Sequence, residues 1–186
     1  MSTLDQFKLF ADYNRLMNRR MLAAAGKLTD AQLKGDRGAF FKSVLGTFNH
    51  ILVGDIIWLN RFNTHPAHKP ALAYLDRLDR PESLDTLLFD DLADLKIERE
   101  KIDAVIIDWI NGMSESDIEG CLEYEDMAGR LHRKPIESLI SHLFLHQVHH
   151  RGQVTTLLSQ SGVDFGETDI LELIEEQPAN ERSQSS

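Results

Sequence analysis

Residues 135–162 read PIESLISHLFLHQVHHRGQVTTLLSQSG. Apolar side chains recur in this stretch at spacings of three and four residues, which is the pattern of an amphipathic helix. Proline is tolerated at the first helical position and glycine commonly follows the last, so Pro135 and Gly162 mark the two ends. The pattern predicts a helix from residue 135 to about residue 161.

Three earlier segments show the same periodicity, at residues 4–28, 40–62 and 84–110. The second is apolar around much of its circumference, which predicts a central position, and the third is long and one-sided. Together with the C-terminal helix they predict an all-α protein, a four-helix bundle. No internal repeat or second domain is visible, so we expect one bundle domain over residues 1–178.

The segments between these helices favour turns or lose the helical period. Two glycines and two aspartates predict a turn region over residues 30–38. Residues 111–134 predict either a small hairpin or an irregular crossover. Residues 169–176 suggest a last short helix, and residues 179–186 are too polar to bury, which predicts a disordered C-terminal tail.

The composition is that of a globular protein of 186 residues, with 42% hydrophobic and 27% charged residues. No apolar run reaches the roughly 18 residues that a membrane span needs, and the first residues lack a secretory signal. We therefore expect a cytoplasmic protein with no membrane partner. A formal charge of −10 without a basic cluster argues against nucleic acid as a partner. The single cysteine, Cys121, is expected to be a small buried hydrophobic residue.

Four of the eight histidines fall within the predicted C-terminal helix: His142, His146, His149 and His150. Residues four apart share a helix face, so two imidazoles at this spacing can bind one ion. At about 100° per residue, His146 and His150 point most nearly towards the apolar face, whereas His142 and His149 lie towards its edge. The alternative interpretation is a chance cluster of surface histidines, or a core histidine satisfied by hydrogen bonds.

A metal site of this kind needs a third protein ligand, because two imidazoles alone hold an ion weakly. His50 lies in the strongly apolar second helix and has the small residues Thr47 and Gly54 one turn away, which leaves room for an ion. Three other histidines lie in predicted loops, where we expect a solvated role: His65, His68 and His132.

Asp55 lies near the centre of the apolar face of the second helix, where a carboxylate must have a partner. It can accept the second ring N–H of a ligand histidine and so fix the tautomer of that ring. The alternative is a buried ion pair or a hydrogen bond to the first helix. His149 is a further candidate for such a supporting contact around the metal.

Several known site types are absent from the sequence. Gln147 follows His146 at the place where His-Glu-x-x-His proteases carry their glutamate. No Glu-x-x-His pair occurs, which excludes the usual di-iron carboxylate bundle, and there is no Gly-rich phosphate loop or nucleophile elbow. The residues alone therefore identify no catalytic group.

Three stretches resemble the DinB-like (DinB/YfiT-like) family of metal-dependent helical bundles, often called damage-inducible. They are YNRLMNRR at residues 13–20, GTFNH through DIIW at residues 46–58, and HLFLHQVHHRGQ at residues 142–153. The resemblance implies a four-helix bundle in which nickel or zinc is held by one histidine of the second helix and a His-x-x-x-His pair of the fourth. By position these ligands are His50, His146 and His150. Members often form homodimers, so a homodimer is the expected assembly.

The resemblance also implies a metal-dependent enzyme with a small-molecule substrate. Characterised relatives include S-transferases that use low-molecular-weight bacterial thiols and a glutathione- or mycothiol-dependent maleylpyruvate isomerase. Thiol transfer or hydrolysis is thus the expected chemistry, with a low-molecular-weight thiol as an expected co-substrate. The alternative is a non-catalytic stress-response protein that binds metal or serves as a scaffold. An open position facing a cavity would favour the enzyme, and a closed site with four ligands would favour the scaffold.

Overall fold

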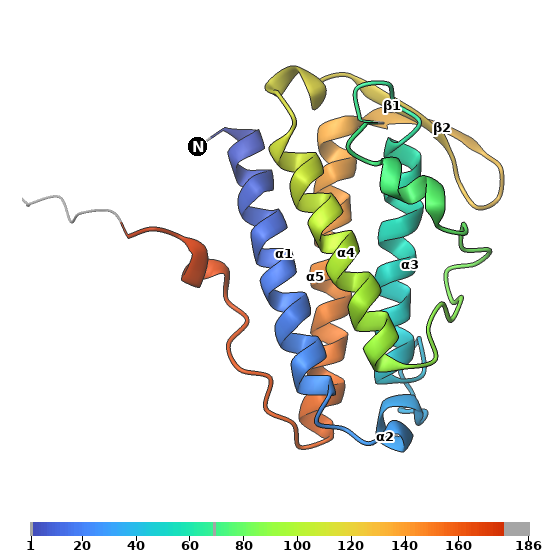
Figure 1. Ribbon diagram of the computed structural model, residues 1–186, viewed down its shortest axis with the longest axis vertical. Helices are drawn as coiled ribbons and strands as arrows, with labels where there is room; N and C mark the ends of the chain where they lie inside the picture. The colour runs from blue at the N-terminus through green and yellow to red at the C-terminus, as the bar shows by residue number, and fades with distance from the viewer. Residues whose placement is uncertain (1, 69, 177–186) are drawn as a thin grey trace, which may run out of the picture.

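The computed structural model describes residues 2–68 and 70–176, and its four long helices form the predicted bundle (Figure 1). They are α1 (Thr3–Ala25), α3 (Val44–Phe62), α4 (Leu92–Asn111) and α5 (Ile136–Gln160). α1 packs on α4 and α5, and α3 packs on α5 and α4. In these two ranges no helix combines the length and the apolar character needed to cross a membrane. The predicted tail at residues 179–186 lies outside the described residues.

Two helices begin later than the periodicity predicts. α3 begins at Val44 rather than at residue 40, because Lys42 adopts a left-handed φ of 65° and the Ser43 hydroxyl caps the first turn. α4 begins at Leu92 rather than at residue 84, because the Asp91 carboxylate caps its first turn. Such capping side chains accept hydrogen bonds from backbone N–H groups that have no partner inside the helix. Each cap stabilises the fold by about 1 kcal/mol. The apolar residues just before both starts belong to connecting segments.

The connection between α1 and α3 contains a short helix, α2 (Asp30–Lys34), where the sequence predicts a turn. That prediction was wrong because Thr29 and Gln32 form a capping box, which begins a helical turn, and because this turn buries Leu33. The short helix predicted at residues 169–176 is a single 3-10 turn, η3 (Ile170–Leu173). Two further 3-10 turns are η1 (Ala73–Arg77) and η2 (Glu115–Asp117).

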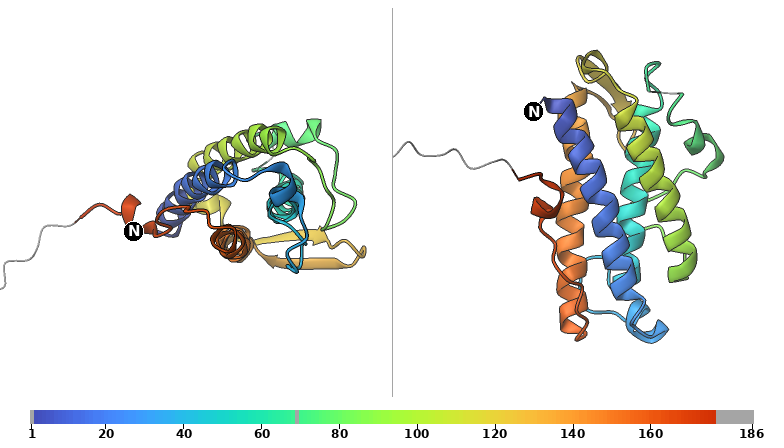
Figure 2. Two further views of the ribbon diagram at one scale, coloured as in Figure 1. Left: turned by 90° about the horizontal axis from the view of Figure 1, so that it is seen from below. Right: turned by 60° about the vertical axis from the view of Figure 1, so that its left-hand side comes forward.

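A two-stranded hairpin precedes α5, which is the first of the two alternatives predicted for residues 111–134. β1 (Cys121–Glu125) and β2 (Leu131–Pro135) pair antiparallel, with Cys121 opposite Pro135. The end-on view in Figure 2 shows the hairpin extending beside α5 and α3. Cys121 is only partly buried, so its prediction as a buried residue was wrong: it lies in a two-stranded sheet that does not cover it completely.

A layer of buried polar side chains divides the apolar core. One apolar cluster lies towards the hairpin and includes Phe7, Phe62 and Trp109, whereas the other lies towards α2 and includes Met21 and Val44. Between them every long helix contributes buried polar residues: Asn14 and Asn18 from α1, Asp55 from α3, Arg99 and Asp103 from α4, and Gln147 and Arg151 from α5. Because buried polar groups need partners, this layer fixes how the helices face one another at mid-height.

Candidate metal centre

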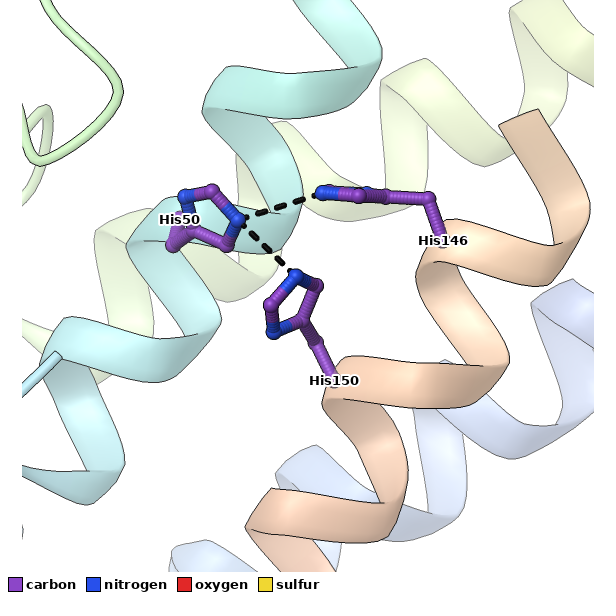
Figure 3. Close-up of side chains that lie close together, drawn as sticks. All are labelled: His50, His146 and His150. Carbon is purple, nitrogen blue, oxygen red and sulfur yellow. Dashed lines mark hydrogen bonds between the residues drawn. The ribbon is translucent and has the colours of Figure 1, made fainter. Parts of the chain in front are cut away.

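Three histidine side chains meet between α3 and α5, as Figure 3 shows. His50 comes from α3, and His146 and His150 come from successive turns of α5. The Nε2 atom of His50 lies 3.2 Å from Nε2 of His146 and 3.1 Å from Nε2 of His150. One nitrogen from each of the three rings lies within 4.8 Å of the other two. The three residues that the sequence singled out are therefore neighbours in space.

The close approach of the two helices depends on Gly54, one turn after His50. A Cβ atom at position 54 would lie 2.6 Å from Cε1 of His146. Carbon atoms in contact are separated by about 3.5–4.0 Å, so only glycine leaves room for this ring. The ring of Phe41 stacks on His50, with centroids 3.6 Å apart and planes 14° apart. Packing thus restrains the orientation of two of the three imidazoles.

Hydrogen bonds at the far nitrogens set the tautomers of two rings. Nδ1 of His50 lies 2.8 Å from the carbonyl oxygen of Leu84, and Nδ1 of His150 lies 3.0 Å from Oε1 of Gln153. Since both partners are acceptors, each Nδ1 carries the proton and donates it. Each Nε2 therefore presents a lone pair, and these two lone pairs face each other across 3.1 Å.

This arrangement fits a divalent metal ion. Two acceptor nitrogens in contact repel each other unless a cation or a proton lies between them. Tetrahedral zinc with Zn–N distances of about 2.0–2.1 Å places two ligand nitrogens about 3.3 Å apart. The separations of 3.1 and 3.2 Å around His50 are close to this value. The donor set of three imidazoles is one that zinc and nickel accept.

The rings are also in the protonation state that a metal needs. Burial, together with a smaller effect of the neighbouring histidines, lowers the pKa of His146 to about 3. Burial likewise lowers the pKa of His50 and of His150 below the ordinary value for histidine. All three rings are therefore neutral at pH 7, and no proton has to be displaced before an ion binds.

A cavity of about 410 Å³ opens beside the histidines. Its wall includes His50 and His146, the α3 residues Trp58 and Arg61, and Met127 of the hairpin turn. This volume lies within the range of small-molecule sites. The histidine cluster thus has a protein-lined space on one side where a substrate can approach.

A comparison with known families identifies the family of the chain. The sequence model of the DinB family matches residues 1–183. The chain belongs to the DinB family. No curated protein and no solved structure matches it. The family match spans the four long helices of this DinB protein and hence both helices that carry the histidine cluster.

The two residues predicted to support the metal have different surroundings in the DinB chain. Asp55 forms a buried ion pair with Arg99 and accepts a hydrogen bond of 2.7 Å from Nε2 of Gln147. Its contacts correspond to the ion-pair alternative, since no histidine is among its partners in the described ranges. His149 is exposed, and its Nε2 atom lies 3.3 Å from Nε2 of Gln153. The Oε1 atom of the same Gln153 accepts the hydrogen bond from Nδ1 of His150.

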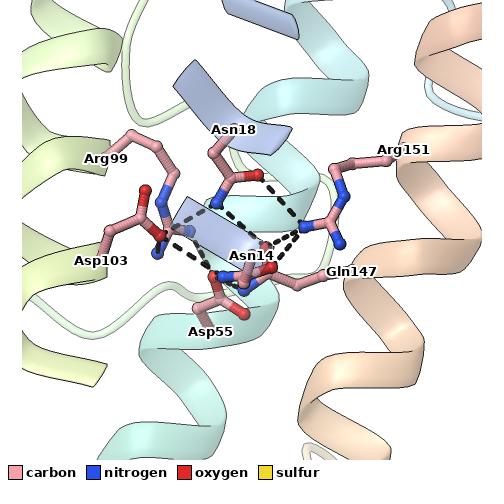
Figure 4. A network of polar contacts seen from close by, with 7 residues as sticks. All are labelled: Asn14, Asn18, Asp55, Arg99, Asp103, Gln147 and Arg151. Atoms are coloured by element: carbon pink, nitrogen blue, oxygen red, sulfur yellow. Dashed lines mark hydrogen bonds and ion pairs between the residues drawn. The ribbon is translucent and has the colours of Figure 1, made fainter. Parts of the chain in front are cut away.

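Asp55 belongs to the layer of buried polar side chains that divides the apolar core (Figure 4). Arg99 also pairs with Asp103 at 2.9 Å, and Arg151 bonds Oε1 of Gln147 at 3.1 Å. Burial raises the pKa of Asp55 to about 6, while the charge of Arg99 opposes this rise. Gln147 and Arg151 directly follow His146 and His150 along α5. The layer therefore fixes α5 against the other helices at the level of the histidine rings.

One histidine prediction from the sequence was wrong. His68 was expected to be solvated in a loop, but it is 1% exposed. It packs edge-on against Trp109 and near Phe62, because the turn after α3 folds back over the end of the bundle. His65 is partly exposed in the same turn, and His132 lies in β2, where it contacts Asp126 at 3.0 Å.

The sequence interpretation missed the partners of the ligand rings. Gln153 stands three residues after His150 on one helix, so helical spacing alone could have suggested it. Leu84 contributes a backbone carbonyl from a connecting segment, and no side-chain pattern signals that. Phe41 precedes the helix start, and the periodicity assigned it to the helix itself.

Proposed function

We propose that this DinB protein is a metal-dependent enzyme that carries out thiol S-transfer or hydrolysis on a small molecule. The observation that carries the proposal is the pair of opposed Nε2 lone pairs on His50 and His150, 3.1 Å apart, with His146 beside them. The proposed ligands of the ion, nickel or zinc, are these three histidines.

An open coordination position supports catalysis over a purely structural ion. Three ligands with a position left for substrate are typical of catalytic sites, whereas structural sites are closed by four protein ligands. The potential metal-binding group found in the described ranges contains three residues, and two of them line the 410 Å³ cavity. A reactant in this cavity can therefore reach the proposed ion directly.

A divalent ion at this site would stabilise the deprotonated form of a thiol or of water and so supply a nucleophile at neutral pH. The protein's own contribution is orientation: Leu84 and Gln153 hold two rings with Nε2 directed inward. In either reaction the sulfur or oxygen forms a bond to an electrophilic carbon as the bond to the leaving group breaks. The proton lost by the thiol or water passes to the leaving group or to solvent.

The first test is elemental analysis of protein purified without chelators. We expect one equivalent of nickel or zinc in the wild type and none in H146A. His146 is one of the two proposed ligands from α5, and its loss leaves only two imidazoles to hold the ion. H149A is the matched control on the same helix and should keep its metal, since His149 is exposed and is not one of the three residues of the potential metal-binding group. One equivalent of metal in H146A would reject the proposed site.

The second test is activity with several low-molecular-weight thiols and an electrophile such as 1-chloro-2,4-dinitrobenzene, and with an activated ester for hydrolysis. We expect turnover that disappears in H146A and persists in H149A. A protein that holds one equivalent of metal but gives no metal-dependent turnover with any of these substrates would favour the alternative, a non-catalytic metal-binding or scaffold protein.

A further inference from the structure

Arg61 lies in the wall of the cavity that His50 and His146 line. Its Cζ atom lies 4.5 Å from the centroid of the Trp58 ring and 4.9 Å from that of Tyr124. These contacts hold the guanidinium against ring faces. Within residues 2–68 and 70–176 the guanidinium has no hydrogen bond or ion pair, although the Arg61 backbone carbonyl accepts from Thr64. Its N–H donors are therefore available to a ligand.

Among the described residues no anion of the cavity wall forms an ion pair with Arg61, although Asp126 is near enough to favour its charged form. The other ionisable side chains of the wall, apart from histidines, are Asp126 and Arg130. These two pair with each other, Nε of Arg130 lying 2.7 Å from Oδ2 of Asp126. In a protein with a formal charge of −10, this cavity thus keeps an unpaired positive charge. Such a charge in a partly desolvated wall attracts an anion more strongly than an exposed one does.

The position of the guanidinium sets the length of a suitable ligand. Helical side chains lean towards the N-terminus, and the Arg61 guanidinium accordingly lies over Trp58, three residues earlier. Trp58 is four residues from Gly54, against which the His146 ring packs, and four residues correspond to a rise of about 6 Å. A ligand with a short carbon chain between its two ends suits an offset of this size along the helix.

We propose that Arg61 anchors the carboxylate of a small-molecule substrate whose reactive group lies at the three histidines. The planar guanidinium offers two parallel N–H groups, which match the two oxygens of a carboxylate. Stacking on Trp58 and Tyr124 holds the fork in place, so less conformational entropy is lost when the carboxylate binds. This inference rests on the proposed function for the role of the histidines, but the binding of the anion to Arg61 can be measured separately.

The test compares 3-mercaptopropionate with 3-mercapto-1-propanol, which has an uncharged hydroxymethyl group in place of the carboxylate. Affinities are measured by calorimetric titration and by tryptophan fluorescence, with metal-loaded and metal-free protein. We expect the wild type to bind 3-mercaptopropionate at least about tenfold more tightly than 3-mercapto-1-propanol, a ratio of affinities that is typical of a charged hydrogen-bonded pair. R61Q should reduce this ratio to about one, while R61K should keep part of it, because lysine retains the charge without the fork.

R80Q is the matched control. Arg80 and Arg61 both line a neighbouring cavity of about 330 Å³, but Arg80 is not part of the wall of the histidine cavity. It should retain the full ratio. R61Q should hold as much metal as the wild type, since Arg61 is not a ligand. A ratio of one in the wild type, an unchanged ratio in R61Q, or a ratio lost in R130Q but kept in R61Q would overturn the proposal.

The two proposals fail in different ways. Protein that binds no metal, yet in its metal-free form prefers the carboxylate through Arg61, would reject the proposed metal chemistry and support the anion site. Protein that loads metal on the histidines, yet shows no preference dependent on Arg61, would reject the anion site alone.

Discussion

The ring of His146 lies directly over Gly54, so that a Cβ atom at position 54 would be 2.6 Å from Cε1 of that ring. Glycine in a helix interior costs about 1 kcal/mol relative to alanine. At position 54 glycine lowers the stability of the helix, but it allows α3 and α5 to lie close together. This close packing brings His50 near the histidines of α5. Gly54 is therefore a structural requirement of the candidate site.

Replacing Gly54 by alanine should displace the His146 ring and weaken metal binding at least about tenfold, the scale seen when the supports of ligands are changed. Affinity is measured by competition with a chromophoric chelator. G152A is the matched control, since a Cβ at Gly152 of α5 meets no atom within 4 Å. G152A should keep its metal affinity and gain up to about 1 kcal/mol of stability. Equal metal affinity in G54A and wild type would contradict the role of Gly54.

Replacing Gln153 by leucine removes the acceptor that holds the Nδ1 proton of His150. The ring would then be free to rotate and to change tautomer, so metal affinity should fall about 10- to 100-fold. Q153E restores an acceptor, and its carboxylate should return the affinity to the wild-type level or above. The same chelator competition gives the measurement, and a Q153L protein with wild-type affinity would show that this contact does not orient the ligand.

The sequence predicted the histidine cluster well because helical spacing is a strong constraint. His146 and His150 lie four residues apart on one face. The residues alone made His50 only the best candidate for a third ligand, and the resemblance to the DinB-like family made it the expected one. The same periodicity failed at the helix starts, where Ser43 and Asp91 cap the helices later than the apolar pattern begins. Partners that come from distant segments, such as the Leu84 carbonyl, depend on tertiary packing, which no local pattern encodes.

Burial of Asp55 leads to a prediction about stability. D55N removes the negative charge that faces Arg99 but keeps an oxygen that can accept from Gln147. Breaking a buried ion pair from one side costs about 3–5 kcal/mol, so urea denaturation of metal-free protein should show a loss of this size. E172Q breaks the partly exposed pair with Arg20 and should cost less than about 1 kcal/mol. Similar losses in both variants would mean that Arg99 finds sufficient compensation in Asp103.

His68 provides a prediction about pH that is independent of the metal. Burial, together with a smaller effect of the nearby His65, lowers the pKa of His68 to about 4. Between that value and the ordinary pKa of about 6.5, the unfolded chain binds the proton more readily than the folded protein. His68 therefore makes stability fall as the pH drops from about 6.5 towards 4, by at most about 1.4 kcal/mol per pH unit. Above about pH 6.5 this penalty vanishes.

H68F should remove this pH dependence, because phenylalanine does not titrate and fits the apolar contact with Trp109. It should also stabilise the protein by about 1 kcal/mol at pH 7, since neither ring nitrogen of His68 has a hydrogen-bond partner among the described residues. H68Q separates the two effects: it loses the titration but keeps a buried polar group, so it should flatten the pH profile without the gain at pH 7. The measurement is the free energy of unfolding of each metal-free protein from pH 4 to pH 8. Profiles of H68F and wild type that run parallel across this range would show that His68 is already protonated or solvated in the folded protein.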